Sequence, residues 1–247
     1  MVNFLKRRLR PITPSQALEK VEVAECSDQP IQLTIVTQFF PPDFAATGQY
    51  MDELATHLGQ QGFRVNVFTG QPSYAFEVAE APAEEQKGPV HITRSNFLRS
   101  RSRRMAGRTL SSLAFCLHTA WHLLDPKNRG DITLFVSEPP YGQVVGWVFS
   151  LLFGTAYAAL VYDLYPDVVT SSGLLPEHHW VVRLWDAVNR RVWHRAEAVI
   201  VPCETMRDRI VAKHPALADS ITVIHNWSDP DWVKPLAKAD NAFAQTH

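Results

Sequence analysis

The chain has 247 residues, three cysteines and a formal net charge of −1 at pH 7. This length allows one sizeable α/β domain, and the near-neutral charge argues against a general nucleic-acid binder. Cys26, Cys116 and Cys203 are far apart and match no metal or redox spacing, which predicts a cytosolic protein. Residues 1–30 lack the apolar core of a signal peptide and are predicted to form a loosely ordered basic and polar tail.

The first predicted elements are a strand at residues 31–38, a helix that ends before Gly62 and a second strand at residues 64–70. The strands are rich in β-branched residues, and the helix carries apolar residues along one face. Together they form the opening βαβ unit of a doubly wound sheet. The loop at residues 39–48 then lies at the carboxyl end of the first strand, where such sheets bind ligands.

Three residues at the predicted helix start are candidate substrate contacts. Thr47 and Gly48, with Gln49 beside them, stand where free N–H groups and the helix dipole attract phosphate. The alternative interpretation of Gly48 is an ordinary glycine in a tight turn.

The rest of the chain alternates between strand and helix patterns in the same way. Further strands are predicted at residues 90–94, 131–137, 157–162, 198–201 and 221–225. Further helices are predicted at residues 107–124, 143–153, 177–195 and 204–213, and residues 79–89 are predicted to be an acidic loop. This alternation predicts an α/β fold, a doubly wound Rossmann-like parallel sheet covered on both faces. The domain is expected to span residues 31–228, with a linker or tail at residues 229–247.

Two segments raise the question of a membrane. Residues 144–161 carry no charge, and a run of about 18 such residues is the lower limit for a spanning helix. The favoured interpretation divides this run at Gly154 into a buried helix and a buried strand, because central parallel strands are apolar throughout.

A cluster of arginines precedes the helix predicted at residues 107–124, which is apolar and contains a tryptophan. Basic amphipathic helices with aromatic residues dock on anionic lipid. The alternative is that the helix packs on the sheet while the arginines are only solvated. The residues of this predicted contact with an anionic membrane surface are Arg99, Arg101, Arg103, Arg104 and Arg108.

Three segments together resemble a known family. They are Gln-Phe-Phe-Pro-Pro-Asp at residues 38–43 with Gly48, Asp-Leu-Tyr-Pro-Asp at residues 163–167, and His-Asn-Trp-Ser-Asp at residues 225–229. With them the chain resembles the N-terminal lobe of a GT-B glycosyltransferase of family four, in the branch that builds bacterial exopolysaccharides of the colanic-acid type. The resemblance covers about residues 31–236.

The resemblance implies a reaction between two Rossmann-like lobes that close around a nucleotide-sugar donor. It implies no catalytic metal and no cofactor, because fixed N–H groups and cationic side chains stabilise the departing diphosphate. The implied acceptor is a lipid-linked sugar at the cytoplasmic face of the membrane, and this lobe receives it. Thr47 and Gly48 would contribute backbone N–H groups from the first lobe.

The same resemblance assigns the predicted catalytic residue. Asp163 stands where relatives carry a His-Asp or Gln-Asp pair near the reacting sugar, and it is the predicted catalytic residue. Tyr162 replaces the His or Gln, so the expected role of Asp163 is to accept hydrogen bonds from sugar hydroxyls and not to act as a general base. The alternative for Asp163 is a turn or N-cap carboxylate. Glu138 is a predicted substrate contact for another reason, because it ends a predicted strand on the ligand edge and could line the acceptor cleft; the alternative is a rigid turn before a helix. Asp167 is a further predicted substrate contact.

The resemblance also implies a missing part. In relatives the cations that grip the diphosphate, and two glutamates seven residues apart, lie on a second lobe. This chain alone is therefore expected to lack most of the donor site and to be inactive. Two other classes stay open, a dinucleotide-binding Rossmann domain and a non-catalytic membrane-associated module. The first would need a Gly-x-Gly-x-x-Gly run, whereas residues 45–48 offer one glycine.

Overall fold

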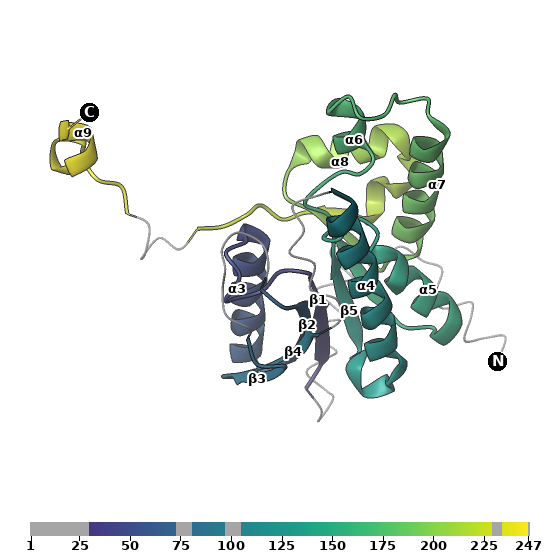
Figure 1. Cartoon of the computed structure of the whole chain (residues 1–247), viewed down its shortest axis with the longest axis horizontal. Helices are drawn as coiled ribbons and strands as arrows, with labels where there is room; N and C mark the ends of the chain where they lie inside the picture. Colours follow the sequence, from purple (N-terminus) through teal and green to yellow (C-terminus); the bar gives the residue numbers. More distant parts are fainter. Residues whose placement is uncertain (1–29, 73–80, 97–104, 229–233, 247) are drawn as a thin grey trace.

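A mixed sheet of eight strands forms the centre of the molecule (Figure 1). The computed structural model describes residues 30–72, 81–96, 105–228 and 234–246. The strand order is β3-β4-β2-β1-β5-β6-β7-β8, and every neighbouring pair is parallel except β3 with β4. The strands are β1 (Gln32–Val36), β2 (Arg64–Gly70), β3 (Glu84–Lys87), β4 (Val90–Ser95), β5 (Ile132–Val136), β6 (Tyr157–Leu160), β7 (Ala198–Val201) and β8 (Ile221–Val223). The predicted Rossmann-like α/β fold is confirmed.

Helices connect the parallel strands and cover both faces of the sheet (Figure 1). Helix α3 lies on one face, and α4, α5, α7 and α8 lie on the other. The short helix α9 lies apart from the sheet in Figure 1. The helices are α3 (Ala46–Gln60), α4 (Met105–Leu124), α5 (Gln143–Phe153), α6 (Asp167–Ser171), α7 (Trp180–Arg195), α8 (Glu204–Lys213) and α9 (Ala242–Thr246), and the 3-10 turns are η2 (Pro126–Asn128), η3 (Pro215–Ser220) and η4 (Lys238–Asp240).

Alternation along the strands divides the core between the two faces. On β1, Ile35 packs toward α3 while its neighbour Val36 packs toward α4 and α5. This follows from the strand period of two, which points successive side chains to opposite faces. Leu33, Ile35 and Val36 are apolar and Thr34 is buried among them, so β1 is buried on both faces, as parallel strands covered by helices are.

The uncharged run at residues 144–161 is a helix followed by a strand. Helix α5 ends at Phe153, and Gly154 adopts a left-handed conformation with φ of 67°. Strand β6 begins at Tyr157 and is buried throughout. The predicted division at Gly154 is confirmed, because a left-handed residue ends a helix and glycine adopts that conformation without a Cβ penalty. Among the described residues, no helix is both long and apolar enough to cross a membrane.

The prediction of a loop at residues 79–89 was wrong, because this segment contains β3. This strand pairs antiparallel with β4 and forms the edge of the sheet, with Glu85 opposite Ile92. Glu85 forms an ion pair with Arg94 at 2.7 Å, and Lys87 forms one with Asp52 of α3 at 2.6 Å. Charged edge strands are common because they discourage pairing with other chains. Helix α6 was also not predicted, and the helix expected from residue 177 begins at Trp180.

Candidate functional site

The strand order reverses between β1 and β5. From β1 the chain continues to β2 and β4 on one side of the sheet, then returns to place β5 on the other side of β1. In doubly wound sheets, ligands bind at the carboxyl ends of the strands at such a reversal. The predicted contacts near Gly48 follow β1, and Glu138 follows β5. They therefore lie at the switch point of this sheet.

Hydrogen bonds join the loops at this carboxyl edge into one surface. The Gln38 N–H after β1 donates to the Glu138 carbonyl oxygen after β5 at 3.2 Å. The Ser137 hydroxyl accepts from the N–H groups of Tyr162 at 3.0 Å and Asp163 at 3.3 Å, which ties the loop after β6 to the same edge. The structure thus brings Glu138 and Asp163 to one edge with the start of α3.

Gly48 is buried in the first turn of α3 and has a packing role. A Cβ at this position would lie 3.1 Å from both the backbone N and the Cα of Phe40. Glycine therefore lets the helix approach the chain after β1 closely, and a tight turn is not the reason for it. The N-cap residue is Ala45, whose side chain offers no hydrogen-bond acceptor to the first-turn N–H groups. Phosphate binding by these groups stays a prediction.

The two neighbours of Gly48 are more accessible. Thr47 is half-buried and Gln49 is exposed. The Gln49 amide donates to Oε1 of Glu53 at 3.0 Å. A substrate contact for either residue stays a prediction.

An aromatic cluster beside these loops was not among the predicted site residues. The Tyr50 ring stacks on Tyr162, with centroids 6.3 Å apart, and meets Trp227 edge-on at 5.2 Å. The Trp227 Nε1–H donates to Oε2 of Glu53 at 2.6 Å. Trp227 belongs to the segment at residues 225–229, so its motif could have indicated a site. Nothing in the local sequence indicates that it meets Glu53.

The phenol of Tyr162 is held in its neutral form. Burial raises the pKa of Tyr162 to about 12, and the nearby ionisable groups of Tyr50 and Glu138 act in the same direction. A neutral phenol can donate a hydrogen bond at physiological pH, which a phenolate cannot.

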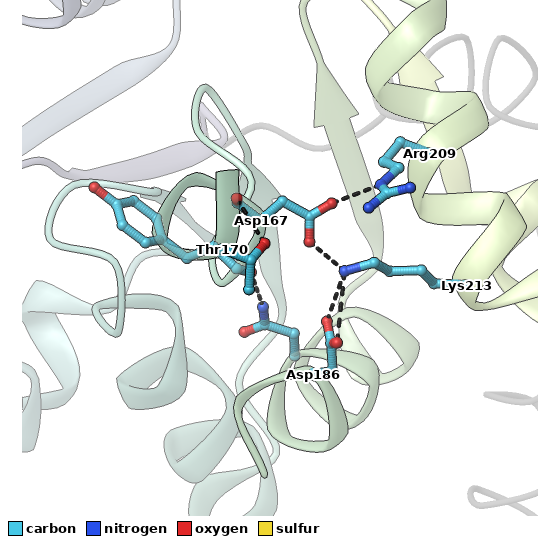
Figure 2. Close-up of polar contacts among 7 residues, drawn as sticks. Asp167, Thr170, Asp186, Arg209 and Lys213 are labelled. Carbon is cyan, nitrogen blue, oxygen red and sulfur yellow. Dashed lines mark hydrogen bonds and ion pairs between the residues drawn. The ribbon is translucent and has the colours of Figure 1, made fainter. Parts of the chain in front are cut away.

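Asp167 lies at the first residue of α6 and is engaged in ion pairs (Figure 2). One carboxylate oxygen accepts from Arg209 Nε at 2.7 Å, and the other contacts Lys213, which also lies 3.1 Å from Asp186. Burial raises the pKa of Asp167, but hydrogen bonds from Lys213 and Arg209 outweigh this and hold the pKa below its usual value. The carboxylate thus ties α6 to α8. A substrate contact for Asp167 stays a prediction.

The predicted membrane arginines are mostly not described. Arg99, Arg101, Arg103 and Arg104 lie outside the described residues, and Arg108 lies in the first turn of α4. In the described part of the chain, no group of three or more His, Cys, Asp or Glu residues is placed to hold a metal ion.

The fold is that of a Rossmann-like domain. Hydrogen bonds join its loops at the carboxyl edge of the sheet, at the switch point where such domains bind ligands. Residues 46–227 match the glycosyl transferase 4-like domain, and the chain belongs to that family. The matched region begins at the first residue of α3 and ends at Trp227, so it includes both sides of the aromatic cluster. No curated protein matches the sequence at a significant level.

A solved structure shows the same fold. Sucrose-phosphate synthase from Thermosynechococcus elongatus aligns with a TM-score of 0.61 and 15% identity, over 85% of this chain and 51% of that chain. Anabaena HepE in complex with UDP and glucose aligns with a TM-score of 0.47 and 14% identity, over 81% of this chain and 46% of that chain. The chain thus spans about half the length of these structures. The predicted GT-B fold of glycosyltransferase family four is confirmed, and the exopolysaccharide branch stays a prediction.

Proposed function

We propose that this chain is the acceptor-binding lobe of a nucleotide-sugar-dependent glycosyltransferase that extends a lipid-linked exopolysaccharide or cell-surface glycan. Membership of the glycosyl transferase 4-like family supports the reaction class. The observation that carries the site is the switch point, where hydrogen bonds join the loops that hold Glu138 and Asp163. A nucleotide-binding oxidoreductase is the weaker alternative, since the first loop lacks the glycine run that close approach of a dinucleotide needs.

In this proposal the chain orients the acceptor sugar. The Ser137 hydroxyl fixes the backbone of Asp163, which leaves the half-buried Asp163 carboxylate to accept hydrogen bonds from sugar hydroxyls. The neutral Tyr162 phenol beside it is a hydrogen-bond donor. Backbone N–H groups at Thr47 and Gly48 face the donor diphosphate, and the positive end of the α3 dipole favours that charge. The cations that grip the diphosphate come from a second lobe.

In this proposal the lobe binds its acceptor at the cytoplasmic face of the membrane and is itself bound peripherally to that membrane. The arginines of residues 99–108 support this, because several basic residues close to an anionic surface each contribute about 1 kcal/mol of attraction.

Transfer assays with and without a second lobe test the proposal. The chain alone should give no sugar transfer, whereas the chain joined to the second lobe of a family member should transfer sugar from a nucleotide-sugar donor. In the joined protein, Asp163→Asn should lower kcat/KM for the acceptor about 10- to 100-fold, because hydrogen bonds to a charged group contribute about 1.5–3 kcal/mol. The exposed carboxylate of Asp219 supplies the matched control, Asp219→Asn, which should leave kcat/KM for the acceptor unchanged.

Two results would contradict the proposal. Robust transfer by the chain alone would show that the donor site is not on a second lobe. Saturable binding of NAD together with no binding of UDP would favour the oxidoreductase alternative.

A further inference from the structure

Helix α4 carries an apolar face that points away from the sheet. Exposed apolar residues recur on it every three or four positions, which places them on one side of the helix. Two of them, Leu117 and Trp121, are 70% and 73% exposed. Phe115 and Leu123, on the opposite side, are buried in the core. The exposed set is Leu110, Leu113, Leu117, Trp121 and Leu124.

Helix α5 extends this face. Leu151 and Leu152 are 58% and 69% exposed, and Val148 and Phe153 are also exposed. Between the two helices lies an apolar groove of about 510 Å³, lined on one side by Leu113 and Leu117. Neither helix contains an aspartate or a glutamate. We call the exposed residues of α4 and α5 named above the α4–α5 apolar surface.

A group of cations borders this surface on the side of α7. Together with Trp147 of α5 they line a hollow of about 300 Å³ between α5 and α7. The Arg195 Nε donates to the Ser150 hydroxyl of α5 at 2.9 Å, so this guanidinium lies against α5. Trp147 is one helical turn from Leu151, which makes the hollow continuous with the apolar surface. The α7 cation group is Arg190, Arg191 and Arg195; His194 also lines the hollow, and all four side chains are exposed.

We infer that the α4–α5 apolar surface and the α7 cation group together dock this domain on an anionic lipid bilayer. Leucine and tryptophan side chains enter the boundary between headgroups and acyl chains, where tryptophan is favoured. The arginines meet the phosphate groups beside them. An apolar protein partner would cover the leucines but offer no anions to the cation group, whereas an anionic bilayer satisfies both.

This inference concerns a different set of residues from the arginines of residues 99–108. It rests on the membrane part of the proposed function and names a further surface for the same contact. Lipid binding is measured without any sugar donor or acceptor, so its failure would contradict peripheral binding and leave the proposed sugar transfer standing.

Flotation of the whole chain with vesicles tests the inference. Vesicles of phosphatidylglycerol and phosphatidylcholine should bind the protein, and vesicles of phosphatidylcholine alone should bind it much more weakly. The double variant Leu117→Ser/Leu152→Ser should lower the partition coefficient about 100-fold, at about tenfold for each leucine withdrawn from the interface. The double variant Arg190→Ser/Arg191→Ser should lower it about 30-fold at low salt and much less at high salt.

Matched substitutions elsewhere serve as controls. Leu236→Ser and Arg64→Ser change an exposed leucine and an exposed arginine away from α4, α5 and α7, and they should leave the partition coefficient unchanged. Because every substituted side chain is exposed, the circular dichroism spectra of all variants should match that of the original protein.

Three results would overturn the inference. One is the absence of binding to anionic vesicles. Another is unchanged binding by Leu117→Ser/Leu152→Ser. The third is concentration-dependent self-association that this variant abolishes in the absence of lipid, which would assign the surface to a second copy of the chain.

Discussion

Replacing Asp167 with asparagine tests whether this carboxylate holds the fold together. Asp167→Asn keeps the size of the side chain and removes its charge from the contacts with Arg209 and Lys213. The Asp167 side chain is 17% exposed, Lys213 is 28% exposed and Arg209 is 53% exposed. Hydrogen bonds to charged groups contribute about 1.5–3 kcal/mol when buried, whereas exposed ion pairs contribute about 0.2–1 kcal/mol. The free energy contributed by the Lys213 contact is therefore expected between these two ranges, and that of the Arg209 contact near the lower range.

We therefore expect Asp167→Asn to lower the free energy of unfolding at pH 7 by about 1–2 kcal/mol. For a domain of this size the loss corresponds to a fall in Tm of about 3–6 °C. Unfolding by urea, followed by tryptophan fluorescence, measures the difference directly. The matched control is Asp219→Asn, which removes an exposed carboxylate in η3 and should change the stability very little.

The pH dependence gives the prediction a second, independent outcome. The folded-state pKa of Asp167 lies below the ordinary value of 3.8. Its contribution is therefore fully present above pH 3.8 and is lost as the pH falls through the lower folded-state pKa. The gap in stability between the original protein and Asp167→Asn should be constant from pH 7 to pH 5 and then close in acid. Equal stability of the two proteins at pH 7, or a gap that widens in acid, would refute this reasoning.

Two further predictions concern the start of α3 and the arginine cluster. Gly48→Val should lower the free energy of unfolding by about 1–3 kcal/mol, because its Cβ would lie 3.1 Å from the Phe40 backbone; an unchanged urea midpoint would show that the helix shifts freely. Joined to a second lobe, this variant should also transfer sugar more slowly. Changing Arg101, Arg103 and Arg104 together to serine should reduce binding to anionic vesicles in flotation without altering the circular dichroism spectrum. Binding that is insensitive to this change and to added salt would mean that these arginines are only solvated.

The main strands and helices were predictable because their patterns are local. Strand β7 and helices α5 and α8 have the predicted bounds, since apolar runs and flanking turn residues define them. Strand β3 was not predictable in this way. Its sequence, Glu-Glu-Gln-Lys, has no apolar alternation, and its order comes from pairing with β4 and from the Arg94–Glu85 ion pair.

The candidate site was predictable only where it depends on strand ends. Residues that follow β1, β5 and β6 could be assigned to one edge, because parallel strands share their carboxyl ends. The partners of Asp167 could not be predicted, since Arg209 lies 42 residues away on α8. The contact between Glu53 and Trp227 joins residues 174 apart. Such contacts depend on how the helices pack, and the periodicity of the local sequence does not indicate them.

The position of Trp227 determines which part of the domain first bears a force applied to the chain after residue 228. Strand β8 lies at the end of the sheet opposite β3, yet only a few residues later Trp227 is hydrogen-bonded to Glu53 of α3, beside Tyr50. The chain after β8 therefore passes over the carboxyl edge toward α3, and Figure 1 shows this path. In mechanical terms, a load applied to the chain beyond Ser228 reaches α3 before it reaches the β7–β8 ladder. Movement of anything attached there is thus transmitted first to the helix that begins at Ala46, next to the switch point.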